Sequence, residues 1–195
     1  MKITKKYESS AVNTFKNGSP VEFFTAKGEY LFTKNKKKYL DLVCGSAVTN
    51  LGHSHKSHEK AINKVLKTGI YHTGTRLTNQ FREELYSKLN LITPDYLNSF
   101  HLCNSGSEAN ETALKLARLH ANNKNIKNKK IIIFDKSWHG RTIATLSATG
   151  NKSVQAGFKP LLGGFIKCQL NDIGSVNKII NNNNVSAIML ETIQG

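Results

Sequence analysis

The sequence predicts an α/β fold in which a mostly parallel central sheet is flanked by helices, preceded by a small amino-terminal part that mixes strands and helices. After Pro94, apolar runs typical of buried strands alternate with segments of helical periodicity. A turn of serine and glycine at residues 105–107 joins one such run to an alanine-rich helix. With 195 residues, of which 38% are hydrophobic, the chain is long enough for one sizeable core and a small appended part.

The residues before Pro94 predict short strands followed by two helices. Alternating segments broken by turn residues favour a small antiparallel meander over residues 21–42, and residues 43–52 are typical of a loop. Apolar side chains at helical spacing predict one helix over residues 57–67 and another over residues 79–91, which Pro94 prevents from continuing.

The residues after Pro94 predict strands and helices in alternation. Ala109, Ala113, Ala117 and Ala121 recur at four-residue spacing, so we expect them to face the sheet from one side of a helix. The expected strands cover residues 100–103, 130–134 and 187–190, and the expected helices follow residue 105 and cover residues 141–146 and 172–180.

These elements divide the chain into three expected parts. Residues 1–52 contain the strands and loop of a small-domain segment, and residues 53–93 form a helical connection. Residues 94–195 form the first part of a larger domain with the parallel sheet.

Composition argues against a membrane, secretory or nucleic-acid role. No run of about 18 apolar residues could span a bilayer, and the first residues lead into no apolar signal core, so we expect a cytoplasmic protein with no membrane partner. The formal charge of +15 comes almost entirely from lysines spread along the chain, without the interleaved aromatic residues of a base-stacking surface. We therefore expect no nucleic-acid partner, and a non-catalytic basic binding module is the alternative.

The cysteine and histidine patterns do not indicate a metal centre. Cys44, Cys103 and Cys168 are too widely separated for a paired metal motif or a disulfide framework, so we expect reduced, buried thiols. Three histidines fall within residues 53–58, but their spacing matches no standard zinc pattern. We expect no bound metal.

Ser105, Gly106 and Ser107 open the alanine-rich helix and form a candidate phosphate site. A helix start presents unpaired backbone N–H groups and the positive end of the helix dipole. Gly106 leaves room for close approach, and the two serine hydroxyls add donors. The alternative is an ordinary capping box, in which Ser105 and Glu108 satisfy the helix start without binding a ligand.

Trp138 and Arg141 follow the predicted strand at residues 130–134 and suit a planar anionic ligand. An indole can stack on a heteroaromatic ring, and a guanidinium can grip a carboxylate with two parallel hydrogen bonds. The alternative is a core tryptophan beside a surface arginine. Ligands of such sheets bind beyond the carboxyl ends of strands, which favours a functional role.

Glu191 closes the last predicted strand, where an uncompensated carboxylate would be costly. We expect a cationic or hydrogen-bonding partner for it, and a structural salt bridge is the alternative. Since Ser105, Trp138 and Glu191 all follow predicted strands, we expect these three points to share one cleft.

In order along the chain, these segments resemble the amino-terminal half of the class III pyridoxal-phosphate-dependent aminotransferases, most of all their acetylornithine branch. The resemblance covers residues 21–195. The matching segments are residues 27–31, 39–41, 50–53, 103–111, 115–118, 139–142, 146–150, 157–162 and 191–195.

The resemblance implies fold type I of the pyridoxal-phosphate-dependent transferases and a set of cofactor contacts. Ser105, Gly106 and Ser107 would hold the cofactor phosphate, and Trp138 would stack on the pyridine ring. Glu191 would sit beside that ring in a hydrogen-bond network. Arg141 would bind the α-carboxylate of the substrate.

The resemblance also implies a homodimer that transfers an amino group to 2-oxoglutarate from N-acetylornithine or a related ω-amino compound, in arginine biosynthesis. Ornithine, succinylornithine and 4-aminobutyrate are the alternative amino donors. In the family, the lysine that forms the Schiff base with the cofactor and an aspartate that holds the pyridine nitrogen are expected beyond Gly195. No catalytic residue is therefore expected within this chain, which looks truncated and should not transaminate alone.

Several positions depart from the family pattern. The family usually has phenylalanine where Trp138 stands, a change that preserves an aromatic ring for stacking. It usually has proline where Lys56 and Thr192 stand. Residues 72–75 replace a common segment near the subunit boundary, so contacts to a partner subunit and substrate specificity could differ there.

Overall fold

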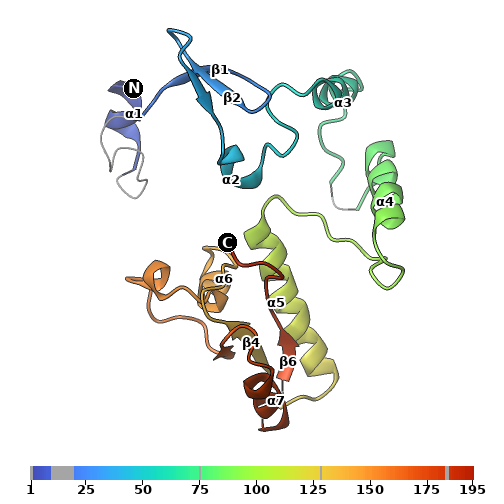
Figure 1. The fold of residues 1–195 in the computed structure, drawn as a ribbon. Helices are drawn as coiled ribbons and strands as arrows, with labels where there is room; N and C mark the ends of the chain where they lie inside the picture. The colour runs from blue at the N-terminus through green and yellow to red at the C-terminus, as the bar shows by residue number, and fades with distance from the viewer. Residues whose placement is uncertain (1, 10–19, 75, 128, 183–184) are drawn as a thin grey trace. The chain divides into compact units, whose positions relative to one another are not determined.

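The computed structural model describes residues 2–9, 20–74, 76–127, 129–182 and 185–195 (Figure 1). The chain divides into two compact units, Met1–Leu85 and Tyr86–Gly195. The expected three-part division stays a prediction. Thr75, the last residue of the segment expected near the subunit boundary, lies outside the described residues.

The first unit contains the predicted antiparallel meander. Its three strands are β1 (Phe23–Lys27), β2 (Tyr30–Thr33) and β3 (Lys38–Leu40), in the order β1-β2-β3. The rings of Phe23 and Tyr39 meet edge to face with their centroids 5.4 Å apart, which adds a side-chain contact to the small sheet.

The helices of the first unit are short except for α3 (Lys56–Leu66). That helix and α4 (Gln80–Ile92), which runs across the division between the units, confirm the two helices expected before Pro94 to within one residue at each end. A short turn, α2 (Cys44–Ala47), lies in the expected loop, and its residues have positive φ angles. The remaining helix is α1 (Lys2–Tyr7).

The second unit is built on a three-stranded parallel sheet. Its strands are β4 (Lys130–Phe134), β5 (Phe165–Cys168) and β6 (Val185–Ile188), in the order β5-β4-β6. The bounds of β4 are those expected, and β6 begins two residues earlier than expected. The sequence did not predict β5.

Helices cover both faces of this sheet (Figure 1). Ile131 and Ile133 of β4 pack on one face with α5 (Gly106–Asn123) and α6 (Ile143–Ala148). Ile132 and Phe134 point to the opposite face and pack with α7 (Ile173–Asn182). The alternation of β4 between two buried faces explains its continuous apolar sequence and confirms the predicted architecture of this unit.

Three details of the sequence expectations are wrong. Residues 100–103 are not a strand, because none of the described strands pairs with them, and the ring of Phe100 stacks on Tyr86 instead. The alanine stripe does not face the sheet as a whole: Ala109 and Ala113 are exposed, while the buried face runs through Leu114 and its neighbours. Cys103 is also exposed rather than buried.

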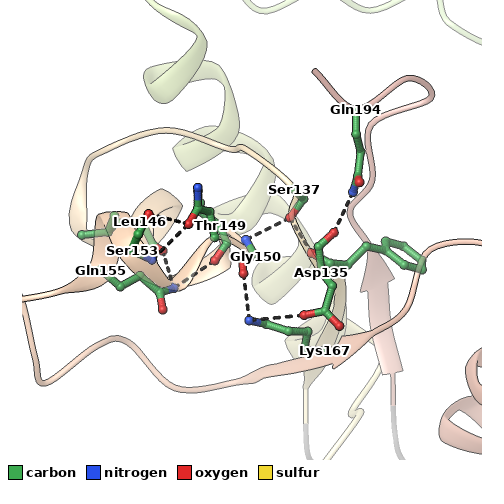
Figure 2. A network of polar contacts seen from close by, with 11 residues as sticks. Asp135, Ser137, Leu146, Thr149, Gly150, Ser153, Gln155, Lys167 and Gln194 are labelled. Atoms are coloured by element: carbon green, nitrogen blue, oxygen red, sulfur yellow. Dashed lines mark hydrogen bonds and ion pairs between the residues drawn. The ribbon is translucent and has the colours of Figure 1, made fainter.

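A network of polar contacts fixes the chain after β4 (Figure 2). The Ser137 hydroxyl donates to the carbonyl of Phe134 at 2.7 Å and accepts from the backbone N–H of Gly150 at 3.0 Å. The Lys167 ammonium reaches the carbonyl of Gly150 at 3.1 Å and the Asp135 carboxylate at 3.7 Å. A side chain at Gly150 would collide with the backbone around Ser137, so glycine is required there. The segment that follows β4 is therefore held in place.

Candidate functional site

The amino terminus of α5 has both a capping box and unpaired donors. The Ser105 hydroxyl accepts from the backbone N–H of Glu108 at 3.2 Å, and the Glu108 carboxylate accepts from the backbone N–H of Asn104 at 2.6 Å. The capping box, which was the alternative to a phosphate site, is therefore formed. The N–H groups of Gly106 and Ser107 are the first two of the helix, and no acceptor among the described residues binds them. They remain available to an anion.

The loop from Trp138 to Thr142 lies against this helix start. The side-chain amide of Asn110 donates to the carbonyl of His139 at 2.7 Å, and the Thr142 hydroxyl donates to the Glu111 carboxylate at 2.5 Å. Gly140 is so close to Ser107 that a Cβ atom there would collide with the serine hydroxyl. Helix start and loop therefore form one site, although they lie about 30 residues apart in sequence.

Trp138 is anchored through its backbone while its ring is left open. The backbone N–H of Trp138 donates to Oε2 of Glu191 at 2.8 Å, and 44% of the residue is exposed. The exposed ring excludes the core-tryptophan alternative. Glu191 has the hydrogen-bonding partner that we expected, and that partner is a backbone N–H rather than a cation. The structure thus brings Ser107, Trp138 and Glu191 together from the three expected points.

His139, the imidazole between Trp138 and Arg141, is a buried residue to which the sequence assigns no role of its own. It is only 4% exposed, its backbone N–H donates to the Thr149 hydroxyl at 3.0 Å, and its Nε2 has no hydrogen-bond partner among the described residues. Burial lowers the pKa of His139 below its usual value, and the nearby Glu191 carboxylate opposes that shift. No local pattern indicated this burial, since buried and exposed residues alternate without a regular period around His139: Ser137 and Gly140 are buried, whereas Trp138 and Arg141 are exposed.

Arg141 projects from the same loop. Its guanidinium carbon lies 5.2 Å from the centroid of the Trp138 ring. The side chain also lines a cavity of about 260 Å³. The other residues that line this cavity are Leu146, Ser153, Val154, Ala156 and Phe158.

These residues fit a group that combines a phosphate with a planar ring. Two backbone N–H groups at a helix start can bind a phosphate, and apart from the helix start itself no atom of the described residues lies within 4 Å of the position that a Cβ atom on Gly106 would take. The open ring of Trp138 can stack on a heteroaromatic ring. The guanidinium of Arg141 can take a second anion.

The described part of the chain contains neither a metal centre nor a membrane-spanning helix. No three histidine, cysteine, aspartate or glutamate side chains converge there as a metal site would require. None of the described helices is both long enough and apolar enough to cross a membrane.

Comparison with known proteins agrees with the site's chemistry. The family model "Aminotransferase class-III" matches residues 14–195. An acetylornithine aminotransferase from Nitrosomonas europaea is 42% identical over 188 residues, which cover 96% of this chain and 47% of that protein. One from Bacillus amyloliquefaciens is 40% identical over 175 residues, which cover 90% of this chain and 73% of that protein. This chain thus spans about half the length of most of the curated relatives that it matches.

The fold has close counterparts among solved structures. An adenosylmethionine-8-amino-7-oxononanoate aminotransferase from Methanocaldococcus jannaschii superimposes with a TM-score of 0.90 at 25% sequence identity. The match covers all of this chain and 47% of that one. Class III aminotransferases depend on pyridoxal phosphate, the kind of group that the helix start and the open indole fit. Because the family model matches nearly the whole sequence, the chain belongs to the class III aminotransferases.

Proposed function

We propose that the intact protein transfers an amino group from N-acetylornithine, or a related ω-amino compound, to 2-oxoglutarate. The names of relatives at 40–42% identity support the acetylated donor. The observation that carries the proposal is the assembly of the α5 start, Trp138 and Glu191 into one site beside Arg141. We further propose that the protein works as a homodimer in the cytoplasm, in arginine biosynthesis.

The helix start and the aromatic loop have separate roles in binding pyridoxal phosphate. The backbone N–H groups of Gly106 and Ser107 would hold the phosphate, with the serine hydroxyls of Ser105 and Ser107 beside them. The indole of Trp138 would lie on the pyridine ring. The bound cofactor supplies an electron sink for the amino-group transfer.

Glu191 and Arg141 have different roles around Trp138. The Glu191 carboxylate holds the backbone N–H of Trp138 and so fixes where the ring stands. It also places a negative charge next to the cofactor site, which favours a protonated partner. Arg141 would bind the α-carboxylate of the substrate, a role supported by a guanidinium with no salt bridge to any described residue.

The function can be tested on the intact protein. It should bind pyridoxal phosphate, seen as an absorption band of the bound cofactor, and transfer the amino group of N-acetylornithine to 2-oxoglutarate. A panel with ornithine, succinylornithine and 4-aminobutyrate would rank the possible donors. No transfer from any ω-amine would overturn the proposal.

The role of Arg141 can be tested separately. Arg141→Ala should raise the KM for carboxylate substrates by about 10- to 150-fold, the effect of losing hydrogen bonds to a charged group worth about 1.5–3 kcal/mol. Cofactor affinity should change little. Arg118→Ala is a matched control, because that guanidinium binds the carbonyl of Gly163 instead. A loss of cofactor before substrate would contradict the assigned role.

A further inference from the structure

The strongest unexplained contact at the site is the one between Arg141 and Trp138. The guanidinium carbon lies 5.2 Å from the indole centroid, within the range of a cation–π interaction. Arg141 is exposed, and no carboxylate of the described residues lies within salt-bridge distance of it. Among the described residues, the Trp138 ring is therefore the group that can fix the position of the Arg141 guanidinium.

The indole is well suited to positioning the guanidinium because hydrogen bonds hold the backbone of Trp138 and of the next residue. Glu191 holds the N–H of Trp138 at 2.8 Å. The next residue, His139, is fixed on both sides, by Thr149 at its N–H and by Asn110 at its carbonyl. Because the backbone that carries the ring is held in place, the ring offers the guanidinium a defined binding position.

The guanidinium stays free to bind an anion while it rests on the ring. Attraction between a cation and the ring quadrupole requires no N–H donor, so the five donors of the guanidinium remain available. Arg141 also lines the cavity of about 260 Å³ whose apolar walls include Leu146, Val154 and Phe158. Apolar walls strengthen the attraction between the guanidinium and a carboxylate that enters.

We propose that Trp138 is a positioning residue for the substrate carboxylate: its indole holds the Arg141 guanidinium and directs the donors of that group toward an incoming anion. This inference rests on the proposed function, because it takes Arg141 as the carboxylate anchor. It adds a second role to a ring whose first role is to stack on the cofactor. Tryptophan suits the second role better than phenylalanine, since its ring attracts cations more strongly.

A double-mutant cycle on the intact, cofactor-saturated protein tests this. Glutarate, an unreactive dicarboxylate, is titrated by calorimetry into the parent, Trp138→Leu, Arg141→Gln and the double variant. Trp138→Leu should weaken glutarate binding by about two- to fivefold, the range of an exposed cation–π contact. In the Arg141→Gln background the same change should have no further effect, since the coupling passes through the guanidinium.

Trp138→Phe is the matched variant and also covers the case in which the leucine variant fails to fold. At saturating cofactor it should bind glutarate less tightly than the parent, since a phenyl ring attracts cations less strongly than an indole. Equal glutarate affinity in the parent and both Trp138 variants would overturn the inference, as would a Trp138 effect that persists without Arg141. Failure of the proposed function is seen separately, as absence of cofactor binding or of amino transfer in the parent.

Discussion

Gly140→Ala should destabilise the protein strongly, because Gly140 joins the aromatic loop to the helix start. Its φ angle of 133° is one that side chains rarely adopt, which costs about 1–3 kcal/mol for another residue. A Cβ atom would collide with the Ser107 hydroxyl and lie 2.6 Å from the Thr145 hydroxyl. That second hydroxyl is 2.7 Å from the hydroxyl of Thr142, and losing this hydrogen bond costs about 1 kcal/mol more. The sum is roughly 2–4 kcal/mol.

The assay is urea unfolding of the intact protein, followed by far-ultraviolet circular dichroism. A loss of this size should lower the urea midpoint by about 1–2 M. Gly163→Ala is the control, because its added methyl group meets no atom within 4 Å and its φ angle is not positive; it should stay within about 0.5 kcal/mol of the parent. If both variants unfold at the same urea concentration, the close packing of loop and helix start is not as described.

Three further outcomes follow from the same geometry. Gly106→Ala should not lower the urea midpoint, since apart from the helix start itself no atom of the described residues lies within 4 Å of the added methyl group. It should nevertheless weaken pyridoxal phosphate binding about tenfold or more, and an unaltered dissociation constant would place the phosphate elsewhere. Burial lowers the pKa of His139 from 6.5, so the unfolded chain binds that proton more tightly and stability should fall as the pH drops below 6.5, by at most about 1.4 kcal/mol per pH unit. His139→Gln should remove this part of the slope in urea midpoints measured between about pH 7 and about pH 5, and an unchanged slope would exclude His139 as its source. Asp172→Ala should lower the urea midpoint, because its carboxylate caps α7 by accepting from the N–H of Ser175 at 2.9 Å; Asp172→Asn should retain most of that stability in the same unfolding assay.

Elements with strong local signals were predicted well. The start of α5 was placed by Ser105 and Glu108, whose side chains do form the reciprocal cap. β4 was placed by an uninterrupted apolar run, because both of its faces are buried. In these cases the residues that decide the structure lie within a few positions of one another.

Elements that depend on distant partners were predicted less well. Residues 100–103 have the apolar character of a strand, but a strand exists only where a neighbour pairs with its backbone, and none of the described strands does. β5 was missed because Lys167 interrupts its apolar pattern; in the fold that side chain reaches Asp135 and Gly150 across the turn network. Neither partner can be inferred from the sequence of the strand itself.

In the candidate site, too, features set by nearby residues could be predicted, whereas features set by distant residues could not. The chemistry of Trp138, Arg141 and Glu191, together with their positions after predicted strands, is enough to indicate them as candidates. The contact between Trp138 and Glu191 spans 53 positions and could be expected only as a shared location, not as a specific hydrogen bond. His139 is held through its backbone by hydrogen bonds to Thr149 and Asn110, which lie 10 and 29 positions away and which no local spacing encodes.

The central claim is that the first turn of α5 and the loop after β4 together hold pyridoxal phosphate. The most direct measurement is a crystal structure of the intact protein with the cofactor bound. The phosphate should lie within hydrogen-bonding distance of the backbone N–H groups of Gly106 and Ser107, with the pyridine ring stacked on Trp138. A phosphate bound away from that helix start, or a pyridine ring that does not contact the indole, would contradict the account.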